Sequence, residues 1–297
     1  MGGESDKTRC GRDVDGLWGT DDSQRSKRVT GLEFVTVAEI EDRLRAAGPR
    51  CYLVKGYWPA GDYGVLSGEP KAQKTTTACD MAVSVASGTP FLGSLAIERS
   101  GPVIMLSGEG GEAPLMRKLD ALARPRGLAL RELPISICTK APHLDDPGHL
   151  EELAVQVTSR QPALVILDPL YLSARGANGS DLFAMGALLE SVQQVCQQQG
   201  ASLLVVHHHN RKEGRGKFRI SGAGPAEWGR VLWTLEVEKF STDPGTTETS
   251  AVIRMDVIGG DVPDQSVRFE RRIRAEVPDD LSSRLHISTE VHTGIGT

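Results

Sequence analysis

A short segment between an apolar run and a helix-like stretch has residue types suited to phosphate chemistry. It reads Gly-Glu-Pro-Lys-Ala-Gln-Lys-Thr from Gly68 to Thr75. In a phosphate-binding loop, backbone N–H groups surround the phosphates, a lysine reaches the β- and γ-oxygens, and a threonine hydroxyl ligates Mg²⁺. The candidate nucleotide-binding residues here are Gly68, Glu69, Pro70, Lys71, Ala72, Gln73, Lys74, Thr75 and Thr76.

One position departs from this pattern, which asks for glycine immediately before the lysine. Gln73 stands there instead. If the loop needs a positive φ at this position, a side chain costs about 1–2 kcal/mol and must turn away from the nucleotide. A match with one deviation also occurs by chance as an ordinary strand-to-helix turn, so the motif needs support from elsewhere in the chain.

An acid at the end of a later apolar run supplies that support. Asp168 follows Ala163-Leu-Val-Ile-Leu167, about ninety residues after Lys74. An aspartate at the carboxyl end of a buried parallel strand lies at the ligand-binding edge of its sheet, where it can help Thr75 to hold Mg²⁺. A cap before Pro169 is the alternative, and the upstream Lys74 and Thr75 favour the metal role.

A second acid stands in the same relation to its own strand. Glu109 ends the run Val103-Ile-Met-Leu-Ser-Gly, and a carboxylate there can orient and deprotonate an attacking water. Glu112 is close by, so one of the two acids is left to cap the helix expected from Pro114.

Three histidines end a third apolar run, Leu203-Leu-Val-Val206. They are His207, His208 and His209, and because successive strand side chains point to opposite faces, the three cannot bind one metal. A polar side chain at this edge can sense a γ-phosphate by hydrogen bonding. It can equally satisfy backbone groups at a strand end, and the sequence does not decide between His207 and His208 as the sensor.

Two loops are expected to open at the same edge. Residues 211–224 place five basic residues and four glycines in fourteen positions, and residues 171–181 follow Asp168. A flexible basic loop beside a phosphate sensor is suited to binding a nucleic-acid backbone in one nucleotide state. A solvated loop without a partner is the plainer interpretation.

The elements that position these residues alternate along the chain. From Gly64, short apolar runs alternate with helix-length stretches, which predicts an α/β core with a mainly parallel sheet flanked by helices. After residue 229 the runs at 231–237, 250–257 and 266–273 predict antiparallel strands extending that sheet.

A capping-box pattern from Thr36 to Glu39 predicts a short helix ending before Gly48. The expected organisation is a disordered arm over 1–30, a single α/β domain over 31–275 and a C-terminal strand or tail over 276–297.

Composition and charge exclude several classes of protein. Of the 297 residues 39% are hydrophobic and 25% are charged, with a net charge of −5, so a generally basic nucleic-acid coat is excluded. No apolar run approaches the roughly eighteen residues of a membrane span. The five cysteines form no C-x-x-C pair, which together with the start of the chain favours a cytoplasmic protein without a membrane partner.

The order of the motifs resembles the RecA-like P-loop ATPase core, and within it the AAA-type ATPases related to RepA hexameric replicative helicases. Residues 68–75 look like the phosphate loop of that family, Glu109 like its catalytic glutamate and Asp168 like its Mg²⁺-site aspartate. Residues 207–212 are similar to its sensor-histidine segment, and 221–233 to the small-residue segment before the antiparallel strands. The resemblance covers roughly residues 50–240.

This resemblance implies a RecA-like P-loop NTPase fold that binds ATP and Mg²⁺ between subunits. It implies a homo-oligomer, for which a hexameric ring is one form, and binding of single-stranded DNA through loops 171–181 and 211–224. A basic residue from the neighbouring subunit completes the site in this family. Lys239 is the first candidate, ahead of Arg230 and Arg254, and ordinary strand-surface charge is the alternative for all three.

The expected activity is ATP hydrolysis on DNA by a helicase-like replication protein of a plasmid, phage or mobile element. Catalysis is expected of Lys74, Glu109 and Lys239. Because Gln73 replaces the loop glycine, the alternative is a nucleotide-binding switch or scaffold with weak or no hydrolysis. A second departure, Ser221 where the family pattern has arginine, concerns coupling to a subunit or to DNA. A small-molecule kinase is disfavoured by the C-terminal strands, and the choice of DNA over RNA, the polarity and the role of the arm stay open.

Overall fold

The computed structural model describes residues 34–174, 181–208, 223–243, 247–276 and 284–292. The predicted arm at 1–30, Ser221 and most of the loop at 211–224 therefore lie outside the described residues. The helices are α1 (Val37–Ala47), α2 (Lys74–Ser87), α3 (Glu112–Ala123), α4 (Pro147–Arg160), α5 (Leu170–Ser173), α6 (Leu182–Gln197) and α7 (Ala223–Trp228), with 3₁₀ turns at Arg124–Arg126 and Leu130–Glu132. The strands are β1 (Tyr52–Val54), β2 (Trp58–Pro59), β3 (Tyr63–Gly68), β4 (Val103–Ser107), β5 (Ile135–Cys138), β6 (Leu164–Asp168), β7 (Ser202–His208), β8 (Val231–Thr242), β9 (Glu248–Gly259), β10 (Gln265–Glu276) and β11 (Arg284–His292).

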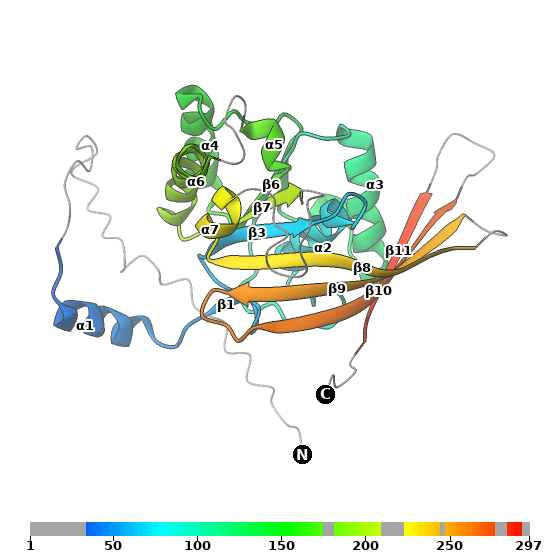
Figure 1. Cartoon of the computed structure of the whole chain (residues 1–297), viewed down its shortest axis with the longest axis horizontal. Helices are drawn as coiled ribbons and strands as arrows, with labels where there is room; N and C mark the ends of the chain where they lie inside the picture. Colours follow the sequence, from blue (N-terminus) through cyan, green and yellow to red (C-terminus); the bar gives the residue numbers. More distant parts are fainter. Residues whose placement is uncertain (1–33, 175–180, 209–222, 244–246, 277–283, 293–297) are drawn as a thin grey trace, which may run out of the picture. The chain divides into compact units, whose positions relative to one another are not determined.

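One nine-stranded sheet organises the larger part of the chain. Its order is β11-β10-β9-β8-β3-β7-β6-β4-β5, so the phosphate-loop strand β3 is central and β7 separates it from β6. The strands from β8 to β5 pair in parallel, and β8 to β11 pair antiparallel. Figure 1 shows the long antiparallel strands β8, β9 and β10 side by side with the parallel half.

The predicted α/β architecture is confirmed, with one refinement in the strand at 231–237. This strand, expected as the first antiparallel one, is parallel to β3 and antiparallel only to β9. It is also longer than predicted, extending as β8 to Thr242. The β1–β2 hairpin was not predicted, since strands of three and two residues are too short to show a period.

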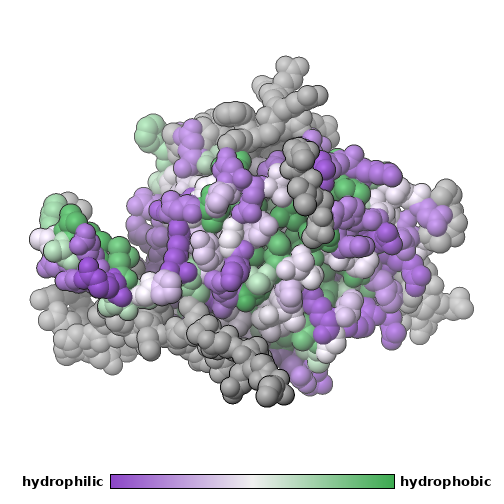
Figure 2. Space-filling model, turned by 90° about the horizontal axis from the view of Figure 1, so that it is seen from below, coloured by the Kyte–Doolittle hydropathy of each residue, from purple (hydrophilic) through white to green (hydrophobic). Residues whose placement is uncertain are grey.

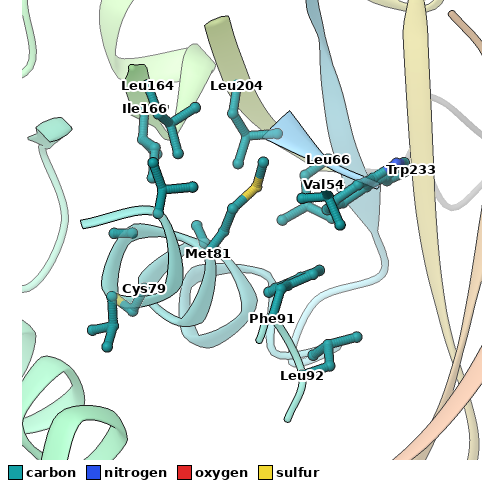
Figure 3. Close-up of a cluster of buried hydrophobic side chains, with 14 of the residues drawn as sticks. Val54, Leu66, Cys79, Met81, Phe91, Leu92, Leu164, Ile166, Leu204 and Trp233 are labelled. Atoms are coloured by element: carbon teal, nitrogen blue, oxygen red, sulfur yellow. The ribbon is translucent and has the colours of Figure 1, made fainter. Parts of the chain in front are cut away.

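Two apolar clusters cover the two faces of the sheet. On one face α2 and α3 pack against even-numbered residues of β7 and β6, among them Leu204, Val206 and Ile166. Figure 3 shows Met81 of α2 pointing toward Leu204. On the other face α4 and α6 pack against odd-numbered residues such as Leu203 and Val205. Because strand side chains alternate, this assignment also fixes the direction of the polar residues at the strand ends.

Helix α1 and the other described residues up to Cys51 form a unit separate from the one that begins at Tyr52. Thr36 is the N-cap of α1 and forms the predicted capping box with Glu39, whose N–H donates to the Thr36 hydroxyl at 3.3 Å. No residue of α1 is buried. The apolar side chains of Val37, Ile40 and Leu44 are therefore exposed.

The surface carries a mixture of polar and apolar residues. On the face seen in Figure 2, hydrophilic residues predominate and apolar residues appear between them. In the described part of the chain, no helix has both the length and the apolar character needed to cross a membrane.

Candidate nucleotide site

The predicted phosphate-binding loop connects the end of β3 to the start of α2. Gly68 ends β3 where a Cβ would lie 2.9 Å from the Leu235 carbonyl oxygen and 3.2 Å from the Cβ of Ala72. Glycine is needed here because β8 passes so closely. The turn itself has two residues with positive φ, Lys71 at 68° and Gln73 at 60°, and the Ala72 N–H donates to the Glu69 carbonyl at 3.1 Å.

Gln73 adopts the left-handed conformation for which the phosphate-loop pattern provides glycine. It is the N-cap of α2, with φ 60° and ψ 31°, and its side chain makes no capping hydrogen bond. Its Oε1 atom is buried and has no hydrogen-bond partner among the described residues. The positive φ on which the argument from sequence depended is therefore present, with its expected cost of about 1–2 kcal/mol.

Lys74 is buried at the first position of α2, with 5% of its surface exposed. Its Nζ donates hydrogen bonds to the carbonyl oxygens of Gly68 at 2.9 Å and Glu69 at 2.8 Å. Burial lowers the pKa of Lys74 to about 8, against the opposing attraction of Asp168 and Glu109. The ammonium group is thus hydrogen-bonded to the carbonyls of its own loop and lies close to the carboxylates of Asp168 and Glu109.

Asp168 ends β6 on the face that α2 covers, because Leu164 and Ile166 of the same strand pack there. Burial raises its pKa to about 6, while a hydrogen bond from the Thr75 side chain lowers it. Its Oδ2 atom is buried without a hydrogen-bond partner in the described part of the chain. A carboxylate oxygen without a partner beside a threonine hydroxyl is a donor set that suits Mg²⁺, so these residues fit the metal that the motif implies.

Glu109 lies in the turn after β4, next to Gly108, whose N–H donates to the Asp168 backbone carbonyl at 3.0 Å. Its carboxylate is exposed and accepts a hydrogen bond from the Tyr171 hydroxyl. Its charge opposes the lowering of the Lys74 pKa, which places the carboxylate near the phosphate loop. Glu112, the other acid considered, is in the first turn of α3, where a negative charge stabilises the helix dipole.

The two described histidines point to opposite faces of β7. His208 follows Leu204 and Val206, which pack on the α2 face, whereas His207 follows Leu203 and Val205 on the other face. The pKa of His208 is lowered by burial and by Lys74, and is raised by Glu109. The structure thus brings His208, rather than His207, to the face that holds Lys74.

Two residues near the site were not identified from the sequence. The half-buried Lys118 of α3 lowers the pKa of Asp168 by its charge. Tyr171 of α5 contacts both Glu109 and His208, its ring centroid lying 5.7 Å from that of His208. The pattern of α3 shows only an amphipathic helix and Tyr171 falls in a predicted loop, so no local signal could have identified either residue.

The three candidates for a residue acting on a neighbouring subunit differ in their surroundings. Arg230 forms ion pairs with Asp62 at 3.2 Å and Asp261 at 3.1 Å. Arg254 is similarly paired with acids of β8 and β9. Lys239 is exposed just past a register shift in β8 and forms no ion pair within the described ranges. It lies on the strand beyond Leu235, the partner of Gly68.

A cavity of about 920 Å³ lies apart from these residues, on the α4 side of the sheet. Its lining includes Ile104, Leu106 and Leu153, together with Gly108 and Leu172, which adjoin Glu109 and Tyr171 in the sequence. Lys74, Asp168 and Glu109 are not among its lining residues. The residues of the predicted chemistry therefore do not line this cavity.

Comparison with known proteins agrees with this arrangement. A family model described as an AAA domain matches residues 28–214, which is more than half of the chain. The match spans the phosphate loop, Glu109, Asp168 and both described histidines, and indicates an ATPase of the AAA-like P-loop type. No curated protein matches the chain.

Proposed function

The chain belongs to the AAA-domain family of P-loop ATPases, and from this premise we propose that it binds and hydrolyses ATP with Mg²⁺ to act on DNA. In this proposal it is a helicase-like replication protein of a plasmid, phage or mobile element, working as a homo-oligomer. One observation supports the ATPase chemistry above all others. Lys74, Asp168 and Glu109 come from three different segments and lie close enough to shift one another's pKa. Asp168 and Glu109 raise the pKa of Lys74, and Lys74 lowers the pKa of Asp168.

The mechanism assigns a task to each of these side chains. Lys74 exchanges the two loop carbonyls for phosphate oxygens, which are stronger acceptors for an ammonium group. Thr75 and Asp168 would hold Mg²⁺, which would supply charge neutralisation at the phosphates. Glu109 orients a water for in-line attack and takes its proton. His208 contributes a hydrogen bond to the γ-phosphate. When hydrolysis removes that hydrogen bond, the position of the following segment, 211–224, changes.

The DNA-directed part of the proposal has its support in the loops. The segment 171–181 begins in α5, directly after Asp168, and the segment 211–224 follows β7, which ends at His208. The second of these has five basic residues in fourteen. Loops that leave a nucleotide site at the same edge are placed to couple phosphate release to a nucleic-acid backbone.

Steady-state ATP hydrolysis with and without single-stranded DNA tests this function. We expect turnover that DNA raises, that Lys74→Ala abolishes and that Glu109→Ala lowers about a hundredfold or more, to a small residual rate. Glu112→Ala is the matched control, because this second acid is in the first turn of α3 and its loss leaves the mechanism intact. Turnover that survives Lys74→Ala contradicts the site, and turnover indifferent to any nucleic acid contradicts the DNA-directed role.

A second candidate function is favoured by Gln73. Its strained backbone and its buried Oε1, which has no hydrogen-bond partner among the residues that the structure describes, suit a nucleotide-binding switch or scaffold with little hydrolysis. In that case Gln73→Gly relieves the strain and raises the ATPase rate by about tenfold or more. Lys71→Gly is the matched control, because Lys71 also has a positive φ but is not the residue immediately before Lys74. A Gln73→Gly rate equal to that of the wild type excludes tuning by this residue.

A further inference from the structure

We propose that Tyr171 is a positioning residue, whose hydroxyl holds the Glu109 carboxylate in the orientation that hydrolysis requires. This inference rests on the proposed function, in which Glu109 orients the attacking water. It adds a residue to the site that neither the motifs nor the family match assigns. The contact that supports it is the hydrogen bond from the Tyr171 hydroxyl to Glu109 Oε1.

The Glu109 side chain needs such a partner because it is exposed. Its backbone is held at Gly108, whose N–H donates to the Asp168 carbonyl, and the turn continues through Gly110 and Gly111, with φ angles of 79° and 70°. Packing does not orient an exposed carboxylate, so its direction depends on the side chain that it contacts. A base that moves freely loses the alignment on which in-line attack depends.

Tyr171, in contrast, belongs to a well-anchored element. Its neighbours Leu170 and Ser173 are fully buried, and the Ser173 carbonyl accepts a hydrogen bond from the Leu144 N–H at 3.0 Å. A Cβ on Gly108 would lie 2.9 Å from Leu172 Cδ1. The backbone of α5 is therefore packed directly against the turn that carries Glu109. This packing holds the half-exposed side chain of Tyr171 beside the Glu109 carboxylate.

The hydrogen bond also persists over the working pH range. Glu109 raises the pKa of Tyr171 to about 12, so the hydroxyl keeps its proton and remains a donor at neutral pH. With Oε1 occupied, Oε2 of Glu109 stays available to accept a proton from water. The carboxylate is thereby oriented without losing its role as a base.

The same side chain also reaches the residue in the sensor position. The ring of Tyr171 lies 5.7 Å from the ring of His208, with 52° between the planes. Tyr171 thus touches the residue that acts on water and the residue that faces the phosphates. Substitution by phenylalanine keeps this ring contact and removes only the hydroxyl, so it isolates the contribution of the hydrogen bond.

The test compares Tyr171→Phe with the wild type in kcat and KM for ATP, and in the Kd for a fluorescent ATP analogue. We expect kcat to fall about tenfold while KM and Kd stay within about twofold, since only the transition state uses the aligned carboxylate. The control is Tyr57→Phe, at the turn between β1 and β2, which we expect to match the wild type. The decisive comparison is Glu109→Ala with and without Tyr171→Phe, which we expect to have equal residual rates.

Three results overturn the proposal. A Tyr171→Phe kcat within about twofold of wild type excludes a positioning role, and a higher kcat means that the hydroxyl restrains Glu109 instead. A further loss on adding Tyr171→Phe to Glu109→Ala means that Tyr171 acts elsewhere. Each leaves the proposed function standing if Lys74→Ala remains inactive and Glu109→Ala retains only a small residual rate. Failure of the function itself appears differently, as turnover that survives Lys74→Ala.

Discussion

At the scale of single residues, the candidate site places charged groups where water is scarce. Asp168 is the clearest case, because burial raises its pKa from 3.8 to about 6. A raised pKa means that the folded state binds the proton more tightly than the unfolded state. Stability therefore falls as pH rises from about 4 to 6, and the ionised Asp168 costs the ligand-free protein stability at pH 7.

Asp168→Asn should remove this cost. In chelator-containing buffer at pH 7 we expect the variant to be more stable by about 2 kcal/mol, with the difference vanishing below about pH 4. Urea unfolding at several pH values measures it, and the exposed Asp145→Asn is the control. The same substitution should abolish Mg²⁺-dependent turnover. An Asn variant that is less stable than wild type at pH 7 contradicts the assignment of this carboxylate as a strained metal ligand.

The sequence indicates some of these residues and not others, for a physical reason. Lys74, Glu109 and Asp168 each follow a short apolar run, and in a parallel sheet the ends of such runs meet at one edge. The structure does bring these three together. Tyr171 and Lys118 reach the same place only through the packing of α5 and α3, which no local pattern encodes.

At the scale of elements, a buried charge network fixes α2 against the antiparallel half of the sheet. Arg271 of β10 is fully buried and pairs with the buried Asp80 of α2 at 3.1 Å. Its guanidinium also donates to the Thr77 hydroxyl at 2.8 Å. Arg126 also donates a hydrogen bond to the Asp80 carboxylate. The helix that begins with Lys74 is thus held by charges from outside its own βα unit.

Removing Arg271 should therefore be costly. We expect Arg271→Ala to lower the free energy of unfolding by about 3–5 kcal/mol, because it leaves a cavity and deprives the buried Asp80 of one partner. The adjacent Arg272 is the matched control. It is half exposed and paired with Glu270, so Arg272→Ala should cost at most about 1 kcal/mol. Urea unfolding measures both variants. Equal decreases in the free energy of unfolding would show that the buried Arg271 contributes no more to stability than the exposed Arg272.

The sequence analysis did not identify Arg271. It stands in the run Arg-Arg-Ile-Arg, but Val267, Phe269 and Ile273 alternate with the polar residues around them. That alternation puts Arg271, unlike Arg272, on the apolar face of the strand. The period of the strand was readable, whereas its contact with α2, almost two hundred residues earlier, was not.

At the scale of the whole molecule, the chain joins a parallel nucleotide-binding half to an antiparallel extension. Apolar runs separated by helix-length segments predict the first half, because parallel strands need long crossovers. The join itself was less predictable. β8 pairs with β3 in one direction and with β9 in the other, and this depends on the path of the chain between β7 and β8 rather than on the residues of β8.

The extension also makes a prediction about assembly. Lys239 lies on β8 beyond the residue that pairs with Gly68, and it is exposed. If the neighbouring subunit supplies this lysine to each nucleotide site, every site needs Lys74 from one copy and Lys239 from the next. Lys74→Ala and Lys239→Ala should then each be inactive alone. After mixing in equal amounts, about one quarter of the interfaces join an intact Lys74 to an intact Lys239. We therefore expect ATPase activity to return to about a quarter of the wild-type rate. Lys55→Ala, at another exposed lysine, should be active alone. An active Lys239→Ala, or a mixture without recovery, contradicts a site shared between subunits through this residue.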